Sequence, residues 1–261
     1  MASGNHYVLG YRQAEQERLQ RQAEELGHES ARLFDEIGIP EGARVLEIGC
    51  GPRGCLDLLS ARVGASGRVV GVEISADALA LAQTFITERG LQNVEVIAGD
   101  ARSTGLPKGS FDLVTSRLIL VTIPQPEQII AEAVALARPG GAVAFHEADR
   151  AAAMCDPPSQ AWDTAEKLFM AVAEKNGNDF YLGRTLPRLL RKAHAGSRAS
   201  PIERGRQLVW WTCASIRSST SKGISISRTR SCFVVSTFRL GAANRTNPGC
   251  PSTRSRASSW A

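Results

Sequence analysis

The sequence predicts an α/β fold in which helices cover both faces of a doubly wound, mainly parallel sheet. Two observations lead to this prediction. Short apolar segments alternate with helical ones from about 43 to 148, and such alternation is typical of a parallel sheet. The first apolar segment then runs directly into a glycine-rich turn, VLEIGCGPRG, which has G-x-G-x-x-G spacing. With 261 residues, of which 43% are hydrophobic, the chain can bury one sizeable core.

The elements follow in order along the chain. A helix is predicted from about 11 to 37, with a break near Gly27, because apolar residues recur there at helical spacing among Glu, Gln and Arg. In the predicted sheet, ligands bind beyond the carboxyl ends of the strands, where the chain order reverses. The strands are predicted at 43–49, 68–74, 94–100, 111–117 and 141–148, and the helices between them at about 54–63, 76–89 and 126–137.

The C-terminal part of the chain differs in charge. Although the net charge is +5, the residues from Ala193 onward hold eleven Arg and Lys and one acid, so the first 192 residues are acidic overall. Three interpretations stay open: a surface that binds nucleic acid by charge, a solvated extension, or a stretch translated out of its ancestral frame. The third explains more, because an amphipathic helix at 182–193 leads into sequence without an apolar period. Two apolar runs, 207–216 and 232–240, could still pair as strands.

Cysteine spacing and apolar runs limit the cofactors and the location. The six cysteines form neither a C-x-x-C pair nor a short Cys/His group, so we predict no metal and no disulfide. The start of the chain has no basic segment followed by an apolar run. No stretch reaches the roughly 18 apolar residues of a membrane helix. We therefore expect a soluble, cytoplasmic protein.

The glycine turn is expected to hold an adenosine cofactor. Its glycines let the backbone approach a ligand, and Glu73 at the next strand end can accept hydrogen bonds from ribose hydroxyls. These features fit a nicotinamide dinucleotide equally well. Glu47 and Asp100 favour another ligand, because acids at three successive strand ends suit an amino group, ribose hydroxyls and an adenine amine. The pattern indicates S-adenosylmethionine (SAM).

Four motifs in this order and spacing resemble the class I SAM-dependent methyltransferases, most closely the group related to ubiquinone and menaquinone methyltransferases. The motifs are VLEIGCGPRG, VVGVEIS, AGDARSTGLPKGSFDLVTSR and ARPGGAVAFHE. The resemblance spans about 7–193 and implies a Rossmann-like, SAM-binding core at 41–192. It also implies an N-terminal helical lid at 1–40, and it leaves 193–261 as a basic tail, frameshifted or poorly ordered, in which the C-terminal strands are degenerate or altered.

The resemblance also implies the cofactor-binding residues. The glycine turn would surround the methionine moiety, the next two strand ends would bind ribose and adenine, and the lid would close over the cofactor. For Tyr7 the alternative is a packed or exposed terminal residue, and for Arg117 it is a surface ion pair. The candidates are Tyr7, Gln22, Glu47, Gly49, Cys50, Gly51, Glu73, Ile74, Gly99, Asp100, Ala101, Ser116 and Arg117.

The expected chemistry asks little of the side chains. Methyl transfer is an in-line displacement, so the enzyme mainly aligns the acceptor and excludes water. A base is needed only if the acceptor must lose a proton, and His146 and Glu147 are the catalytic candidates; a structural histidine within the strand is the alternative for His146.

The acceptor itself is expected to be a small molecule. No Asn/Asp-Pro-Pro-Tyr-like signature of DNA or amide-nitrogen methylation follows the fourth strand. We expect O-, C- or N-methylation, without a membrane or nucleic-acid partner, and a homodimer is left open. The altered tail predicts that SAM binding survives while acceptor binding is impaired or altered. An NAD(P)-dependent oxidoreductase and a non-catalytic SAM-binding protein stay open as alternatives.

Overall fold

The computed structural model describes residues 7, 9–10, 12–195, 211–217 and 228–239. The strands are β1 (Arg44–Ile48), β2 (Arg68–Glu73), β3 (Val94–Ala98), β4 (Phe111–Arg117), β5 (Ala137–Asp156), β6 (Trp211–Arg217) and β7 (Arg228–Arg239). The α-helices are α1 (Gln13–Glu25), α2 (Gly27–Ile37), α3 (Leu56–Val63), α4 (Ala76–Glu88), α5 (Pro126–Leu136), α6 (Gln160–Lys175) and α7 (Leu186–Ala195), and the short 3-10 helices are η1 (Leu120–Thr122) and η2 (Leu182–Arg184).

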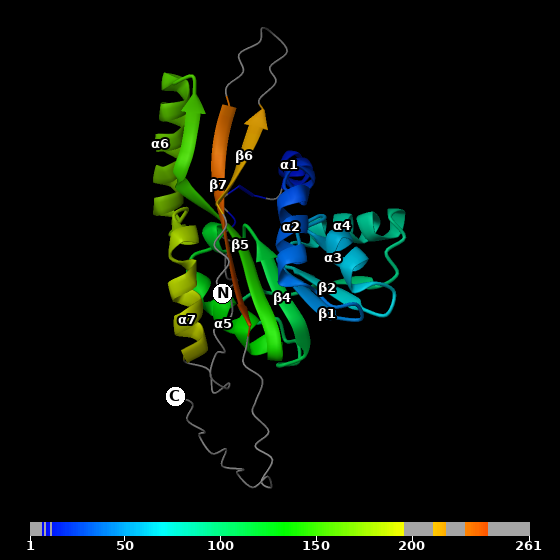
Figure 1. Ribbon diagram of the computed structural model, residues 1–261. Helices are drawn as coiled ribbons and strands as arrows, with labels where there is room; N and C mark the ends of the chain where they lie inside the picture. The colour runs from blue at the N-terminus through cyan, green and yellow to red at the C-terminus, as the bar shows by residue number, and fades with distance from the viewer. Residues whose placement is uncertain (1–6, 8, 11, 196–210, 218–227, 240–261) are drawn as a thin grey trace, which may run out of the picture.

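The described strands form one sheet in the order β3-β2-β1-β4-β5-β7-β6 (Figure 1). Strands β1 to β5 pair in parallel, whereas β7 runs antiparallel to both of its neighbours. The chain order reverses between β1 and β4, the place where ligands bind in such sheets. The predicted doubly wound α/β sheet is confirmed.

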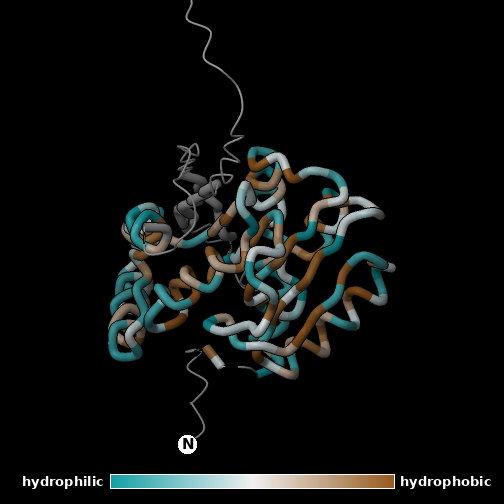
Figure 2. The backbone as a smooth tube through the Cα atoms, turned by 90° about the horizontal axis from the view of Figure 1, so that it is seen from below, coloured by the Kyte–Doolittle hydropathy of each residue, from teal (hydrophilic) through white to brown (hydrophobic). Residues whose placement is uncertain are grey.

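Each face of the sheet has its own hydrophobic core. One core packs Phe111 and Phe145 of the sheet against α5 and α7, and the other packs Val45 and Leu113 against α2, α3 and α4. Because both faces are covered, apolar residues follow one another along the inner strands, and hydrophobic segments run through the middle of the molecule (Figure 2). This two-sided packing fixes the strand ends that surround the site.

The predicted N-terminal helix is two helices. The break falls at Leu26, between α1 and α2, and α2 ends at Gly38, whose φ of 67° is left-handed. The expected break near Gly27 and the expected end are therefore confirmed. None of the described helices combines the length and apolarity that crossing a membrane requires.

Two parts of the described fold differ from the predicted elements. Helix α6 was not predicted, and β5 runs on to Asp156 instead of ending near residue 148. The reason for the longer strand is its pairing with β7, whose register runs from Ala142 opposite Arg239 to Asp156 opposite Arg228. A partner so distant in sequence leaves no local signal.

Two segments of the basic tail belong to the sheet. Pairing of the apolar runs at 207–216 and 232–240 was left open, and in the structure β6 pairs with β7, with Trp211 opposite Val234 and Arg217 opposite Arg228. β6 is the edge strand, and β7 lies between it and β5. The rest of the tail, 196–210, 218–227 and 240–261, lies outside the described residues.

Candidate active site

A cavity of about 740 Å³ lies at the carboxyl ends of the central strands. One end is bounded by the glycine turn and by the ends of β2 and β3. The other is bounded by the segment after β4, by β5 and by α6, and α1 contributes further wall residues. We call these the glycine-turn end and the acceptor end. Most of the predicted cofactor-binding residues line the cavity, namely Tyr7, Gln22, Glu47, Gly49, Cys50, Gly51, Glu73, Ile74, Gly99, Asp100, Ala101 and Arg117.

Two glycines of the turn differ in the space around them: Gly54 is crowded and Gly51 is not. Gly54 has a φ of 56°, and a Cβ there would lie 2.7 Å from the carboxylate oxygens of Glu47 and from the carbonyl oxygen of Cys50. Gly51 has a similar φ of 57°, but a Cβ there would meet nothing within 4 Å. The first position is closed by packing, whereas the second leaves open space beside the backbone.

Glu47 is hydrogen-bonded to the backbone directly after the glycine turn. Its carboxylate is buried, and both oxygens accept hydrogen bonds from the Cys55 N–H at 2.9 Å, just before α3 begins. Burial raises the pKa of Glu47 to about 7, although the Arg117 guanidinium opposes the shift. The sequence predicted a carboxylate facing the ligand. In the structure the residue lines the cavity, but its hydrogen bonds hold the loop.

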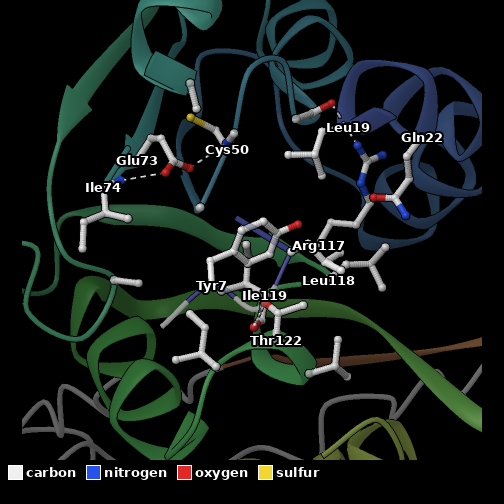
Figure 3. A pocket seen from close by; sticks show the side chains of 18 of the residues that line it. Tyr7, Leu19, Gln22, Cys50, Glu73, Ile74, Arg117, Leu118, Ile119 and Thr122 are labelled. Atoms are coloured by element: carbon white, nitrogen blue, oxygen red, sulfur yellow. Dashed lines mark hydrogen bonds between the residues drawn. The ribbon is translucent and has the colours of Figure 1, made fainter. Parts of the chain in front are cut away.

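Glu73 is held by the backbone at the end of β2. It accepts hydrogen bonds from the N–H groups of Gly51 at 2.9 Å, Ile74 at 2.9 Å and Ser75 at 2.8 Å (Figure 3). An ionised carboxylate has about four acceptor positions, so one remains for a ligand hydroxyl. Beside it, the Ile74 side chain is 51% exposed and offers an apolar surface.

Asp100 lies at the more exposed end of the same wall. Its carboxylate pairs with the Arg102 guanidinium, with Nη2 to Oδ2 at 2.7 Å. The hydrogen bonds from Arg102 lower the pKa of Asp100, although its partial burial works against them. The third acid of the predicted set is therefore ionised and already has a cationic neighbour.

The residues that were predicted to form a lid reach the cavity through hydrogen bonds among Tyr7, Glu15 and Arg18. Tyr7 points into the cavity (Figure 3). Its hydroxyl donates a hydrogen bond to Glu15 at 2.6 Å. Glu15 in turn pairs with Arg18 at 2.7 Å. Burial, with the Glu15 contact, raises the pKa of Tyr7 above its usual value, so the hydroxyl stays protonated.

Of the two residues predicted at the end of β4, only Arg117 reaches the cavity. It donates to Ser30 Oγ at 2.9 Å and to the Gly54 carbonyl at 3.1 Å, which joins α2 to the glycine turn. The alternative of a surface ion pair is therefore wrong for Arg117. Ser116 is fully buried within β4 and is not part of the described cavity wall.

The catalytic candidates His146 and Glu147 require a correction, because neither lines the cavity. Since β5 continues to Asp156, both lie inside the strand rather than beyond its end. Burial lowers the pKa of His146 to about 3, which keeps the ring neutral. Glu147 accepts hydrogen bonds from the N–H groups at the start of η1, from Ile119 at 3.1 Å, Leu120 at 3.0 Å and Val121 at 3.3 Å. The geometry favours a positioning role for Glu147 over that of a base.

The acceptor end contains residues that the sequence reasoning missed. Leu118 has a φ of 57°, an uncommon conformation for this residue type. The rings of Phe169 and Phe180 meet edge to face with their centroids 4.7 Å apart. The helical pattern of α6, with its Ser159 N-cap, was a usable signal for Phe169. The missed residues at this end are Leu118, Ile119, Thr122, Phe169, Ala173, Asn178 and Phe180, and Gln16 of α1 is a further missed residue of the cavity wall.

The chain contains no evident metal centre in the part that the structure describes. No group of three or more His, Cys, Asp and Glu side chains is arranged there to hold an ion. Cys50, Cys55 and Cys155 are free thiols, and burial raises the pKa of both Cys50 and Cys55. The cysteine in the glycine turn is thus a small, neutral wall residue.

Comparison with known proteins identifies a family. Residues 39–193 match a methyltransferase-domain family. An aklanonic acid methyltransferase from a Streptomyces strain is 36% identical over 114 residues, 44% of this chain and 52% of the relative. A demethylmenaquinone methyltransferase from Anoxybacillus flavithermus is 32% identical over 107 residues, 41% of this chain and 45% of the relative. The chain spans about half the length of these curated relatives.

The fold also has solved counterparts. A SAM-dependent methyltransferase from Aquifex aeolicus superposes with a TM-score of 0.56 at 17% identity, and the match covers 87% of this chain and 99% of that one. At this identity the likeness concerns the fold alone. It agrees with the sheet order and with the position of the cavity.

Proposed function

We propose, on the premise that the chain belongs to the methyltransferase-domain family, that it binds SAM and transfers a methyl group to a small-molecule acceptor. The observation that carries this proposal is a continuous cavity that joins the glycine-turn end to the acceptor end. Its volume of about 740 Å³ lies within the range of small-molecule sites, about 300–1,000 Å³. Both reactants would therefore occupy one enclosed space.

The glycine-turn end fits the cofactor. Gly51 borders open space, Glu73 keeps acceptor capacity for a hydroxyl, and the exposed Ile74 side chain offers a flat group an apolar contact. We infer that these residues hold the adenosine part and that Asp100 and Ala101 lie at the adenine. The comparisons lend no support to the NAD(P)-dependent alternative.

SAM, when bound, supplies a methyl group on a positively charged sulfur. The chain itself binds, orients and excludes water. Tyr7 and Leu19 close the lid side, and Glu147 fixes the η1 segment that presents Ile119 to the cavity. Orientation and exclusion of water are what an in-line displacement needs from the protein.

The finer description remains our proposal. The names of the relatives refer to aklanonic acid and demethylmenaquinone, which supports a small-molecule acceptor for this chain. The division into lid, core and tail, the cytoplasmic location, the absence of a nucleic-acid partner and a homodimer are predictions from the sequence. So is the expectation that acceptor binding is impaired or altered.

Calorimetry and a methyl-transfer assay test the proposal. We expect S-adenosylhomocysteine to bind and NADH not to bind, and a panel of quinone and polyketide acceptors to be methylated. Glu73→Gln keeps the size but removes an acceptor and a charge, so it should weaken S-adenosylhomocysteine binding by about tenfold or more. Glu88→Gln, on the exposed end of α4, is the matched control.

The outcomes separate the three hypotheses. Binding of NADH in place of S-adenosylhomocysteine would overturn the cofactor assignment. Binding of S-adenosylhomocysteine without transfer to any acceptor would favour the non-catalytic alternative. Equal affinity in the Glu73 and Glu88 variants would remove Glu73 from the cofactor site.

A further inference from the structure

The charged side chains along the described cavity wall all have partners within the protein. Carboxylates bind backbone N–H groups or guanidinium groups, and guanidinium groups bind carboxylates, a hydroxyl or a carbonyl. At the acceptor end, Asp149 pairs with Arg184 at 2.7 Å, and Arg150 pairs with Glu166. The two charged side chains at the acceptor end are therefore already in ion pairs. The charged wall residues are Glu15, Arg18, Glu47, Glu73, Asp100, Arg102, Arg117, Asp149 and Arg150.

Two uncharged polar residues of the same wall differ from the charged ones, because their side chains have no hydrogen-bond partner. Gln16 of α1 is 4% exposed, and Asn178, which follows α6, is 8% exposed. In both side chains the amide oxygen and the amide nitrogen are buried and have no hydrogen-bond partner. Both residues line the cavity.

Such groups need an explanation. A buried amide without partners costs about 1–3 kcal/mol, and most buried polar atoms in native proteins are paired. The last torsion of an amide side chain is broad, so the group can turn toward a ligand at little cost. A ligand that supplies both a donor and an acceptor would satisfy each amide.

The surroundings of Asn178 indicate the shape of that ligand. Its backbone N–H donates to the Ala173 carbonyl at 2.9 Å, which fixes the residue at the end of α6. The rings of Phe169 and Phe180, inclined at 64° to one another, line the same part of the cavity. Aromatic walls favour a ring system, since rings pack against one another edge to face or offset.

We propose that Gln16 and Asn178 are the specificity-determining contacts for the methyl acceptor, and that this acceptor is an uncharged ring compound carrying hydroxyl or carbonyl oxygens. The inference rests on the proposed function and specifies its substrate class. A hydroxyl both donates and accepts, and a carbonyl accepts, so together they match the amide groups. A charged acceptor would lose its hydration without gaining an opposite charge at this end, because Asp149 and Arg150 are already in ion pairs.

The test uses full-length protein saturated with S-adenosylhomocysteine and four bicyclic probes in calorimetry. Hydroxytetralone carries both polar groups and no charge, tetralone lacks the hydroxyl, tetralin lacks both, and naphthoate carries a carboxylate. We expect affinity to fall in the order hydroxytetralone, tetralone, tetralin, with about tenfold lost for each missing polar group. Naphthoate should bind at least about tenfold more weakly than hydroxytetralone.

Two nearly isosteric variants assign the contacts. Asn178→Leu and Gln16→Met should each weaken the binding of hydroxytetralone by about tenfold and leave the affinity for tetralin unchanged. Because each removes an unpaired buried amide, the melting temperature of the ligand-free protein should stay the same or rise. Asn176→Ala and Gln13→Met are matched controls, since both residues are exposed, lie near their counterparts and are absent from the cavity wall.

The outcomes distinguish this inference from the proposed function. If S-adenosylhomocysteine does not bind, the proposed function fails. If it binds but naphthoate is preferred, or if both variants bind hydroxytetralone like the wild type, the inference fails and the function stands. If Gln16→Met weakens S-adenosylhomocysteine instead of the probe, Gln16 belongs to the cofactor and its assignment to the acceptor is overturned.

Discussion

Glu47 and Glu73, at the glycine-turn end of the cavity, accept hydrogen bonds from backbone N–H groups, whereas the amides of Gln16 and Asn178 neither donate nor accept one. The carboxylates are fixed before any ligand binds, which suits a partner that never varies. The amides keep their hydrogen-bonding capacity for a second partner. The difference shows that preorganisation can be distributed unevenly within one cavity.

The largest expected effect is a loss of stability at the glycine turn. A small loss would show that this end of the cavity is not rigid, contrary to the contrast drawn above. Gly54→Ala should lower the free energy of unfolding by about 3 kcal/mol, because a Cβ at positive φ would clash with backbone and with Glu47. Denaturant titration measures the loss. Gly51→Ala shares the positive φ without the clash, so it should cost only about 1–2 kcal/mol.

The same pair of variants separates stability from binding. The Cβ of Gly51→Ala would enter the open space beside the turn, so this folded variant should bind S-adenosylhomocysteine about tenfold more weakly or worse. Unchanged affinity in calorimetry would show that the cofactor does not approach the backbone there.

The next effect is a pH dependence of the free energy of unfolding. It arises at the acceptor end, where Glu147 holds η1 with a buried carboxylate. Burial raises the pKa of Glu147 to about 8, despite the N–H groups it accepts from. A carboxyl group whose pKa is raised by folding stabilises the folded protein most at a pH below its ordinary pKa, 4.5 for Glu147. This contribution is lost as pH rises through about 8. We expect the free energy of unfolding to fall by about 1 kcal/mol between roughly pH 7 and 8, and Glu147→Gln to abolish this slope.

Glu47 and His146 titrate in other pH ranges, so their contributions can be separated from that of Glu147 between about pH 7 and 8. The pKa of Glu47 is raised to about 7, so Glu47→Gln should flatten the profile mainly below that pH. The pKa of His146 is lowered to about 3, so its contribution is lost as pH falls below its ordinary range near 6.5. A wild-type profile that stays level above about pH 7 would argue against a neutral, buried Glu147.

A smaller effect is expected at the contact between α2 and the glycine turn. Arg117→Met removes the hydrogen bonds to Ser30 and to the Gly54 carbonyl, so unfolding should become about 1–2 kcal/mol easier. Ser30→Ala removes only the first bond and should cost less. Equal losses in the two variants, measured by thermal unfolding, would show that the bond to Gly54 contributes nothing.

The smallest effect is expected where the glycine-turn end opens to solvent. Arg102→Ala leaves Asp100 without its ion pair, but both side chains are about one-third exposed, so the free energy of unfolding should change by less than about 1 kcal/mol. The pKa of Asp100 should rise toward its ordinary value, which NMR titration measures. A larger loss of stability would mean that the pair is a structural part of this end.

The two ends of the cavity also differed in how far the sequence predicted them. The glycine turn, Glu73 and Asp100 sit next to local signals, a strand followed by a glycine or an acid, and the structure places all of them at the cavity. Asn178 and Phe169 have no such motif, because their position depends on where α6 packs. Local pattern therefore revealed the cofactor side and missed the acceptor side.

The errors at His146 and Glu147 have one physical cause. The apolar pattern of β5 weakens near residue 148, so both residues were assigned to the strand end, where polar groups face a ligand. Pairing with β7 carries the strand on to Asp156, and the two side chains lie in its buried interior. The hydrogen bonds of Glu47 to the loop were likewise hidden, because they depend on three-dimensional closure of the turn.

The position of β7 gives the molecule a way to diversify. It pairs with β5 opposite His146 and Glu147, the residues beside the segment that forms the acceptor end, while β2 and β3 lie on the far side of the sheet. On the proposed function, substitutions in β7 would therefore alter acceptor choice before they disturb cofactor affinity. A lineage with this arrangement could explore new substrates through its C-terminal sequence while inheriting the cofactor site unchanged.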